Sequence, residues 1–438
     1  MTDGLTPERS LHMKKNRKIF YGWWILIACF FLSGGGVGIL INSMGTFIKP
    51  VSEALNYSRA KLSLATSLSS FAGMLLYPVW GSYMKNHSIR KAMICTGFLI
   101  PLVFLAFSFC RQMWQFYLCA ILIGCMTGSI STLPITTIIN NWFEDFRGMA
   151  TGIGTSGSGL SMIIVPIISA VIMRYGWQNA YRTLGLMYFF VIVPLCFFII
   201  RDKPEDVGLT PYVKPDAKGS DSGSESAKWG LTRSEALKND AFRYYLLLSL
   251  MAGLINTSII NHTYAFMTDI GMGEKHASLM VSLQMLSLMV SKLMLGTIMD
   301  KKGLRFGFML SLYGYVLAGM FLMLGAYYTP MAYFAVVCSG IGGAIPAMSI
   351  AYTTRHLFGS REYSALCSVV LSFGFLGQTM GTAINGIIFD LTGSYKLGWL
   401  LVMAEALLMI LLFLTVLKKT AHQSCGSDAI IANLGERR

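Results

Sequence analysis

The stretch ASLMVSLQMLSLMVSKLMLGTIMDKKG, residues 277–303, decides the fold expected for this chain. Its apolar part, residues 277–299, is long enough to cross a bilayer as one helix. Lys292 nevertheless lies inside it, about two turns before the charged end at 300–302. An ammonium near mid-membrane costs about 2.5–3.5 kcal/mol on insertion scales, so it normally faces a protein interior or a water-filled cavity. We therefore predict that Lys292 is a fixed positive charge in the path of an anion.

Three polar side chains share one face of this predicted helix. Gln284, Ser287 and Ser291 follow the i, i+3, i+7 spacing, and Lys292 lies at the edge of their stripe. The stripe makes Gln284 and Ser291 candidate substrate ligands, although serines also bond to their own helix backbone. The alternative for Lys292 is that its long side chain extends to the nearby membrane surface and contacts no substrate.

The rest of the chain has the composition of a polytopic membrane protein. Of its 438 residues, 54% are hydrophobic and 13% are charged, whereas a soluble domain averages about 25% charged residues. The net charge of +14 does not indicate nucleic-acid binding, because Lys and Arg cluster in short segments between apolar runs. The nine cysteines are scattered, with no CxxC pair, so we expect neither a metal site nor a disulfide framework.

Apolar runs predict twelve transmembrane helices, six on each side of a long polar segment. The expected fold is an all-α membrane protein with two pseudo-symmetric six-helix bundles. Placing the N-terminus in the cytoplasm puts most Lys and Arg residues on that side, which predicts an integral plasma (inner) membrane protein with both termini and the linker cytoplasmic. The predicted parts are an N-terminal segment 1–19, a bundle 20–200, a flexible linker 201–241, a bundle 242–417 and a tail 418–438.

The two halves of the chain repeat. GSYMKNHSIR at 81–90 recurs as GTIMDKKGLR at 296–305, which lies 215 positions later, and NWF at 141–143 recurs loosely as HLF at 356–358. Two six-helix halves in parallel predict a pseudo-two-fold axis along the membrane normal. A substrate site is then expected between the halves at mid-depth.

Several motifs resemble one family of transporters. Residues 296–305 closely match the loop signature G-x-x-x-D-[RK]-x-G-x-R, although Lys85 stands where the first copy should have its Asp. Further similarity is carried by GWW at 22–24, YSRAKLSLATS at 57–67, NNWFEDFRGMATG at 140–152 and GTAINGIIFDLTGSY at 381–395. With these motifs the chain resembles the major facilitator superfamily, and within it the monocarboxylate porter and oxalate–formate antiporter branch.

The resemblance implies a monomeric secondary transporter in which Lys292 pairs with the substrate carboxylate. It also implies an inside gate, for which the predicted residues are Asp300, Arg305 and Arg147. The helix at 363–389 lacks the second cation of dicarboxylate antiporters, which favours a monoanion. Leu288 occupies the place of the Asp that proton-coupled members often carry, so the resemblance does not favour proton symport through that pair.

Other candidate substrate ligands are polar residues of three further predicted helices. His262 could bond to substrate or carry a proton, and Asn261 lies beside it. Asn42 follows three consecutive glycines that let helices approach closely. Gln378 lies in the predicted helix 363–389. Each has a structural alternative, which is a hydrogen bond to a neighbouring helix.

The sequence holds no catalytic motif. GIGTSG at 152–157 satisfies G-x-G-x-x-G but lies in an apolar helix, so we interpret it as helix packing and expect no cofactor and no metal. We therefore predict a transporter of small organic anions, of the monocarboxylate type, that works by alternating access with anion exchange or proton coupling. The alternatives are efflux of amphipathic compounds and a non-transporting membrane sensor that signals through the linker.

Overall fold

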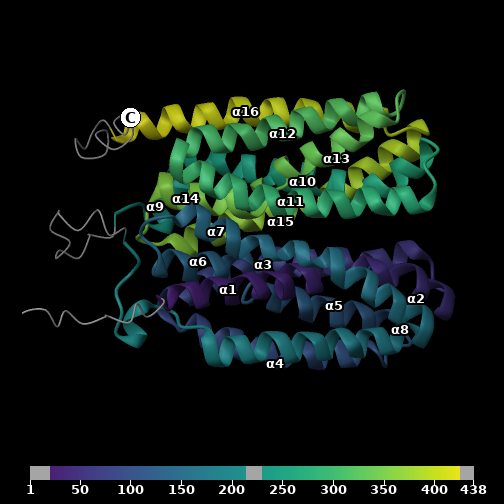
Figure 1. Ribbon diagram of the computed structural model, residues 1–438, viewed down its shortest axis with the longest axis horizontal. Coiled ribbons are helices and arrows are strands. Elements are labelled where there is room, and N and C mark those ends of the chain that lie inside the picture. The colour runs from purple at the N-terminus through teal and green to yellow at the C-terminus, as the bar shows by residue number, and fades with distance from the viewer. Residues whose placement is uncertain (1–19, 214–228, 425–438) are drawn as a thin grey trace, which may run out of the picture.

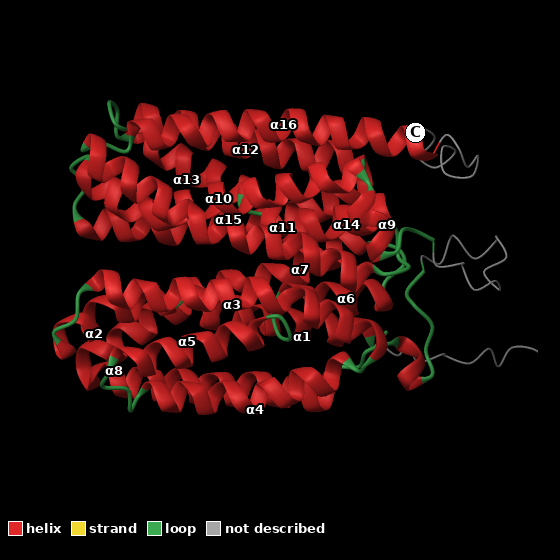
Figure 2. Ribbon diagram, turned by 180° about the vertical axis from the view of Figure 1, so that it is seen from behind, coloured by secondary structure: helices red, strands yellow, loops and turns green. Residues whose placement is uncertain are grey.

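The computed structural model describes residues 20–213 and 229–424, which form helices and, within these ranges, no strand. The helices gather in two groups that lie side by side (Figures 1 and 2), which we call the N-terminal half (20–213) and the C-terminal half (229–424). The N-terminal half contains α1 (Gly22–Ser33), η1 (Gly34–Asn42), η2 (Met44–Phe47), α2 (Ile48–Leu55), α3 (Arg59–Asn86), α4 (Ile89–Phe107), α5 (Met113–Thr127), α6 (Thr132–Trp142), α7 (Arg147–Ser156), η3 (Gly157–Leu160), α8 (Ser161–Pro194), η4 (Leu195–Ile199) and η5 (Pro204–Val207). The C-terminal half contains α9 (Arg233–Lys238), α10 (Asp240–Asp269), α11 (Glu274–Lys302), α12 (Leu304–Gly325), α13 (Pro330–Gly342), η7 (Ile345–Ser349), α14 (Ile350–Phe358), α15 (Tyr363–Thr392) and α16 (Lys396–Ser424).

These helices provide twelve crossings of a membrane. In the described residues, 10 helical stretches are long and apolar enough to span one. The stretch Arg147–Ile199 is 53 residues long and counts as two crossings, because the chain breaks at Gly176 (φ 81°) and turns back. The twelfth is α3, which is less apolar but 28 residues long. The predicted all-α fold with two bundles is therefore confirmed.

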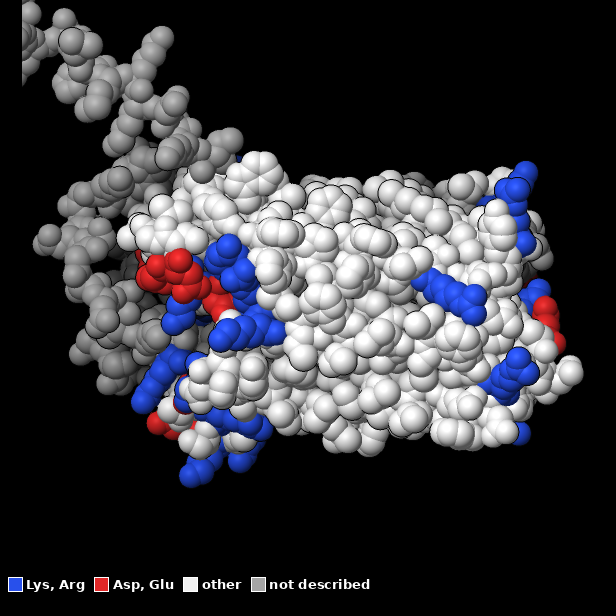
Figure 3. Space-filling view, turned by 90° about the horizontal axis from the view of Figure 1, so that it is seen from below, with Lys and Arg blue, Asp and Glu red and all other residues white. Residues whose placement is uncertain are grey.

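The surface suits a lipid environment. On the face that Figure 3 shows, Lys, Arg, Asp and Glu gather toward the two ends of the molecule, and the band between them is almost uncharged. Large apolar side chains such as Leu102, Phe190 and Leu411 are more than half exposed within their helices. Apolar exposure on this scale is typical of a surface that contacts acyl chains. The protein is an integral, multi-pass membrane protein.

The segment 201–241, predicted as a flexible linker, has ordered pieces at both ends. The turn η5 and Tyr212, whose backbone pairs with Phe143, lie on the N-terminal half. The helix α9 lies on the C-terminal half, and α10 begins at Asp240. The predicted N-terminal segment 1–19, residues 214–228 of the linker and residues 425–438 of the tail lie outside the described residues.

The two halves approach closely where α7 crosses α11. A Cβ atom added to Gly296 would lie 2.1 Å from the carbonyl oxygen of Gly148, and one added to Gly148 would lie 2.4 Å from the carbonyl oxygen of Gly296. Neither glycine can therefore carry a side chain without a shift of the backbone. We call this side of the molecule, where Asp300, Lys85 and the linker also lie, the linker end.

We predict that Gly296→Ala forces the halves apart at the linker end. Overpacking of a tight contact costs about 1–3 kcal/mol, so the melting temperature of the purified protein should fall by several degrees. Gly273→Ala is the matched control, because a Cβ atom there meets nothing within 4 Å. An unchanged melting temperature for Gly296→Ala would show that the backbones do not touch there.

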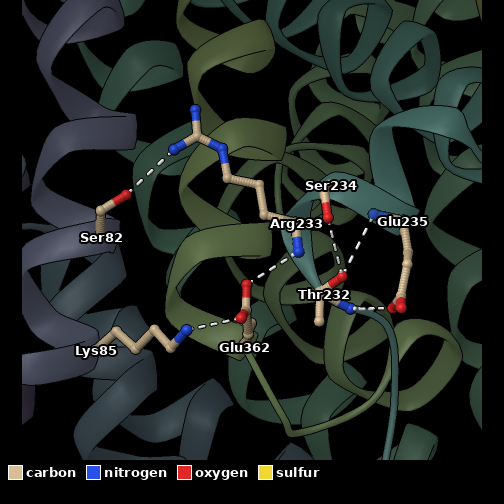
Figure 4. Close-up of polar contacts among 7 residues, drawn as sticks. All are labelled: Ser82, Lys85, Thr232, Arg233, Ser234, Glu235 and Glu362. Carbon is tan, nitrogen blue, oxygen red and sulfur yellow. Dashed lines mark hydrogen bonds and ion pairs between the residues drawn. The ribbon is translucent and has the colours of Figure 1, made fainter.

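A second contact closes the linker end between α3 and α15. The Lys85 ammonium donates to Glu362 Oε1 at 2.7 Å, and the backbone N–H of Arg233 donates to Glu362 Oε2 at 2.9 Å. The Arg233 guanidinium in turn donates to Ser82 Oγ at 3.1 Å. One carboxylate thus joins helix α3, helix α15 and the start of the linker helix α9 (Figure 4).

This second contact lies at the positions that the sequence repeat makes equivalent to the first, with the charges exchanged. The repeat of 215 positions aligns Lys85 with Asp300, and it aligns Arg147 with Glu362. Asp300 accepts from backbone N–H groups at the start of α7, whereas Lys85 forms an ion pair with Glu362, the residue before α15. The Lys85 ammonium and the Arg233 N–H hold the pKa of Glu362 below its usual value.

A double-mutant cycle tests this ion pair. Lys85→Glu and Glu362→Lys should each lower the melting temperature, and the double substitution should recover part of the loss. The Lys85 side chain is 44% exposed, so the coupling free energy should be about 0.2–1 kcal/mol. If the two single losses simply add in the double variant, the pair does not hold the halves together.

Candidate functional site

Helix α7 receives its N-terminal cap from the other half of the protein. The backbone N–H groups of Gly148 and Met149 donate to the two carboxylate oxygens of Asp300, at 2.8 and 2.7 Å. The hydroxyl of Tyr352 also donates to Asp300, at 3.2 Å. The first N–H groups of a helix have no partner within the helix, and a carboxylate there suits the positive end of its dipole. Asp300 of α11 therefore serves as a cap between the halves.

Lys292 of α11 lies at the opposite end of α7. Its ammonium donates to Ser158 Oγ at 2.8 Å and to the carbonyl oxygen of Thr155 at 3.3 Å. These acceptors flank Ser156, the last residue of α7, where one 3-10 turn follows. The Lys292 side chain is only 4% exposed, so the alternative that it extends to the membrane surface does not hold.

The spacing of the two charges is close to the length of α7. Lys292 and Asp300 are eight residues apart, which is a rise of about 12 Å, and the ten residues of α7 rise about 15 Å. Asp300 lies at the start of α7, where an anion stabilises the helix dipole, whereas at Lys292 the helix continues through η3 into α8. Between them, a Cβ atom on Gly152 would lie 2.3 Å from the carbonyl oxygen of Lys292, so the two backbones touch.

A chain of hydrogen bonds connects this cluster to Asn42. Ser161 Oγ donates to the carbonyl oxygen of Ser158 at 3.0 Å. Asn42 Nδ2 donates to Ser161 Oγ, also at 3.0 Å. Asn42 ends η1 and is exposed, whereas Ser158 and Ser161 are buried. The structure therefore brings two predicted site residues, Lys292 and Asn42, into one polar cluster between the halves.

Sequence reasoning missed the partners that connect them. Thr155 lies in the glycine-rich stretch 152–157, which we interpret from the sequence as helix packing, and Ser158 and Ser161 follow directly after it. That packing is present, since a Cβ atom on Gly157 would lie 1.7 Å from the carbonyl oxygen of Phe30. The signal available was the alternation of serines with glycines, because glycines bring a neighbouring helix close enough for the serines to reach it.

The polar stripe of α11 faces a different helix from the one that Lys292 contacts. Gln284 Nε2 donates to Ser339 Oγ at 3.0 Å, and Ser287 Oγ donates to the carbonyl oxygen of Val337 at 2.8 Å. Both acceptors belong to α13 of the same half, so this face of α11 is turned away from α7. Ser291 is buried next to Lys292 in the chain. A role of Gln284 or Ser291 in substrate binding stays a prediction.

The remaining candidate ligands lie within the C-terminal half. His262 Nδ1 is 3.4 Å from the hydroxyl of Tyr395, where α10 meets the start of α16. Asn261 is exposed on α10. Gln378 is half-buried on α15, where Thr257 donates to its backbone carbonyl at 3.0 Å. The roles of these three residues also stay predictions.

The two other predicted gate residues have different surroundings. Arg147 begins α7, beside the N–H groups that Asp300 caps, and its Nε donates to the carbonyl oxygen of Phe143 at 2.8 Å. Arg305 is exposed at the start of α12 and makes no hydrogen bond or ion pair within the described residues. Asp300 thus contacts the opposite half, whereas Arg305 points to solvent.

A hollow in the structure lies away from Lys292. It is mostly apolar and belongs to the N-terminal half, toward the end opposite the linker. Its lining residues are Met44, Phe47, Ile48, Val51, Leu62, Ala65, Thr66, Ser69, Phe107, Phe116, Ala120, Ile123 and Tyr181. No residue of the Lys292 cluster lines this hollow.

Comparisons with known proteins agree with this architecture. The family model of the Major Facilitator Superfamily matches residues 25–382 and 245–429. The MFS-type transporter pytF of Aspergillus terreus is 26% identical over 65% of this chain and 91% of its own length. Monocarboxylate transporter 12 of Xenopus laevis is 22% identical over 90% of this chain and 88% of its own length.

The fold is also found in a solved structure. The crystal structure of the human organic anion transporter MFSD10 (TETRAN) has a TM-score of 0.59 and 14% identity, and the match covers 90% of this chain and 97% of that one. Monocarboxylate transporters recur among the relatives over most of their length, which supports the branch expected from the sequence motifs. The chain belongs to the major facilitator superfamily.

Proposed function

We propose that this protein is a secondary transporter of small organic anions that carry one carboxylate. The observation that carries the proposal is the environment of Lys292. Its ammonium is buried between the halves, and among the described residues it bonds only to neutral oxygens, those of Ser158 and Thr155. A buried charge without a counter-charge is costly, so a carboxylate that reaches the Lys292 ammonium between the halves would gain a strong charge-assisted hydrogen bond from it.

The number of charges favours a monoanion. Lys292 is the one Lys or Arg residue in the middle of the α11 span, and α15 carries none within Tyr363–Thr392. A single ammonium neutralises one carboxylate and leaves the second charge of a dianion without a partner. The proposal has further support from relatives that are named monocarboxylate transporters and from a fold neighbour named an organic anion transporter.

The two halves would expose the cluster to each side of the membrane in turn. We propose that the linker end is cytoplasmic, so that the contacts of Asp300 and Glu362 close the cytoplasmic side in this state. The empty cluster carries one positive charge, and a bound monoanion makes it neutral. The loaded protein should then reorient more easily than the empty one, which favours anion exchange over net flux. We propose a monomer with no catalytic activity.

Lys292→Met tests the proposal, because it removes the charge and keeps most of the volume. Removing one partner of a buried charge pair costs 2 kcal/mol or more, so uptake of labelled acetate, lactate or pyruvate into proteoliposomes should fall about thirtyfold or more. Lys275→Met is the matched control, since Lys275 is exposed at the other end of α11. Uptake of a monocarboxylate that survives Lys292→Met at the wild-type rate would contradict the proposal.

The same assay separates the alternatives. Efflux of amphipathic compounds should survive Lys292→Met, whereas carboxylate transport should not. Accumulation of any labelled monocarboxylate in vesicles that contain only this protein excludes a purely sensory role. Net uptake as fast as exchange would favour proton symport, with His262 as the group to substitute next.

A further inference from the structure

The carbonyl oxygen of Thr155 has more donors than it can satisfy. Ser33 Oγ donates to it at 3.0 Å, Ser158 Oγ at 3.1 Å and Lys292 Nζ at 3.3 Å. The backbone N–H of Gly157 donates to it as well. A carbonyl oxygen has two lone pairs, so four donors compete for two positions. Ser158 plays two parts here, because its hydroxyl accepts from Lys292 at 2.8 Å and donates to Thr155.

These acceptors carry a fraction of the charge that a substrate would bring. The hydroxyl of Ser158 and the carbonyl oxygen of Thr155 are neutral groups with only partial negative charge, because the helix continues past Ser156 through η3 into α8. A carboxylate brings a full negative charge to the same ammonium. These two acceptors and the carboxylate therefore compete for the same donor atom, Lys292 Nζ.

We infer that Ser158 and the Thr155 carbonyl act as an internal substitute for the substrate carboxylate, which an incoming monoanion must displace from Lys292. This inference rests on the proposed function, and it gives Ser158 a positioning role. In the empty protein the bond from Lys292 to Ser158 joins α11 to η3, the turn that follows α7, across the two halves. Binding of the anion replaces that bond, which loosens one of the contacts that hold the halves together.

Two serine-to-alanine substitutions should act in opposite directions. Ser158→Ala removes the competing acceptor, so the half-saturating concentration of the transported monocarboxylate should fall about threefold to tenfold. The rate of exchange relative to net flux should fall as well, because the empty protein is less firmly tied. Ser33→Ala removes a donor that competes with Lys292 for the Thr155 carbonyl, so the half-saturating concentration should rise about twofold.

The matched control is Ser156→Ala. Ser156 is buried in the same turn, but its hydroxyl donates to the carbonyl oxygen of Ile153 at 2.8 Å and not to the cluster. This variant should keep both the half-saturating concentration and the exchange ratio. All variants are measured as full-length protein in proteoliposomes with whichever of acetate, lactate or pyruvate the wild type transports.

The outcomes separate this inference from the proposed function. If the wild type transports none of the three probes, or if Lys292→Met transports them normally, the proposed function fails. If transport requires Lys292 but Ser158→Ala raises or leaves unchanged the half-saturating concentration, Ser158 does not compete with substrate and the inference alone fails. If Ser158→Ala does not fold, Ser33→Ala decides, and anything other than a rise overturns the inference.

Discussion

Two opposite charges of one helix, α11, hold the short helix α7 of the other half. Asp300 caps the N-terminal end of α7, and Lys292 bonds to the turn where α7 continues into η3. The Asp300 cap matches the helix dipole and is worth about 0.3–2 kcal/mol. Because both charges belong to α11, they fix the register of the two helices, and the contact of Gly148 with Gly296 allows the backbones to approach closely enough. The contact of Lys85 with Glu362 joins a second pair of helices, α3 and α15, at the same end of the molecule.

Asp300 and Lys292 differ in how far their hydrogen-bonding capacity is used. Asp300 receives donors on both of its oxygens, including the hydroxyl of Tyr352. Lys292 has three N–H donors, and it bonds to neutral oxygens only, within the described residues. Asp300 is therefore suited to a structural role, whereas Lys292 retains capacity for an anion. In our proposal the residue that binds substrate also joins the two halves. A substrate that binds one arrangement of the halves more tightly than another can therefore shift the equilibrium between these arrangements.

Much of this architecture could be predicted from the sequence. The lengths of the apolar runs predicted the number of membrane-spanning helices. The loop signature indicated the family and a place for Asp300 at the inside gate. A lysine in an apolar helix pointed to a buried charge, because lipid exposure of that charge is costly. Gln284 and Ser287 were expected to lie at the same site as Lys292, but they face α13. Periodicity tells which residues share a helix face, but not which neighbouring helix that face contacts. The ion pair of Lys85 with Glu362 was missed because its partners are 277 positions apart, and Ser158 was missed because a serine among glycines resembles packing.

A structure of the protein with a bound monocarboxylate tests the central claim most directly, since it locates the Lys292 ammonium in the loaded state. Our account predicts that Lys292 Nζ lies within hydrogen-bonding distance of the ligand carboxylate and no longer bonds to Ser158 Oγ or the Thr155 carbonyl, while Asp300 keeps its place at Gly148 and Met149 if the linker end is still closed. A ligand bound elsewhere, with the ammonium still on Ser158 and Thr155, would contradict it.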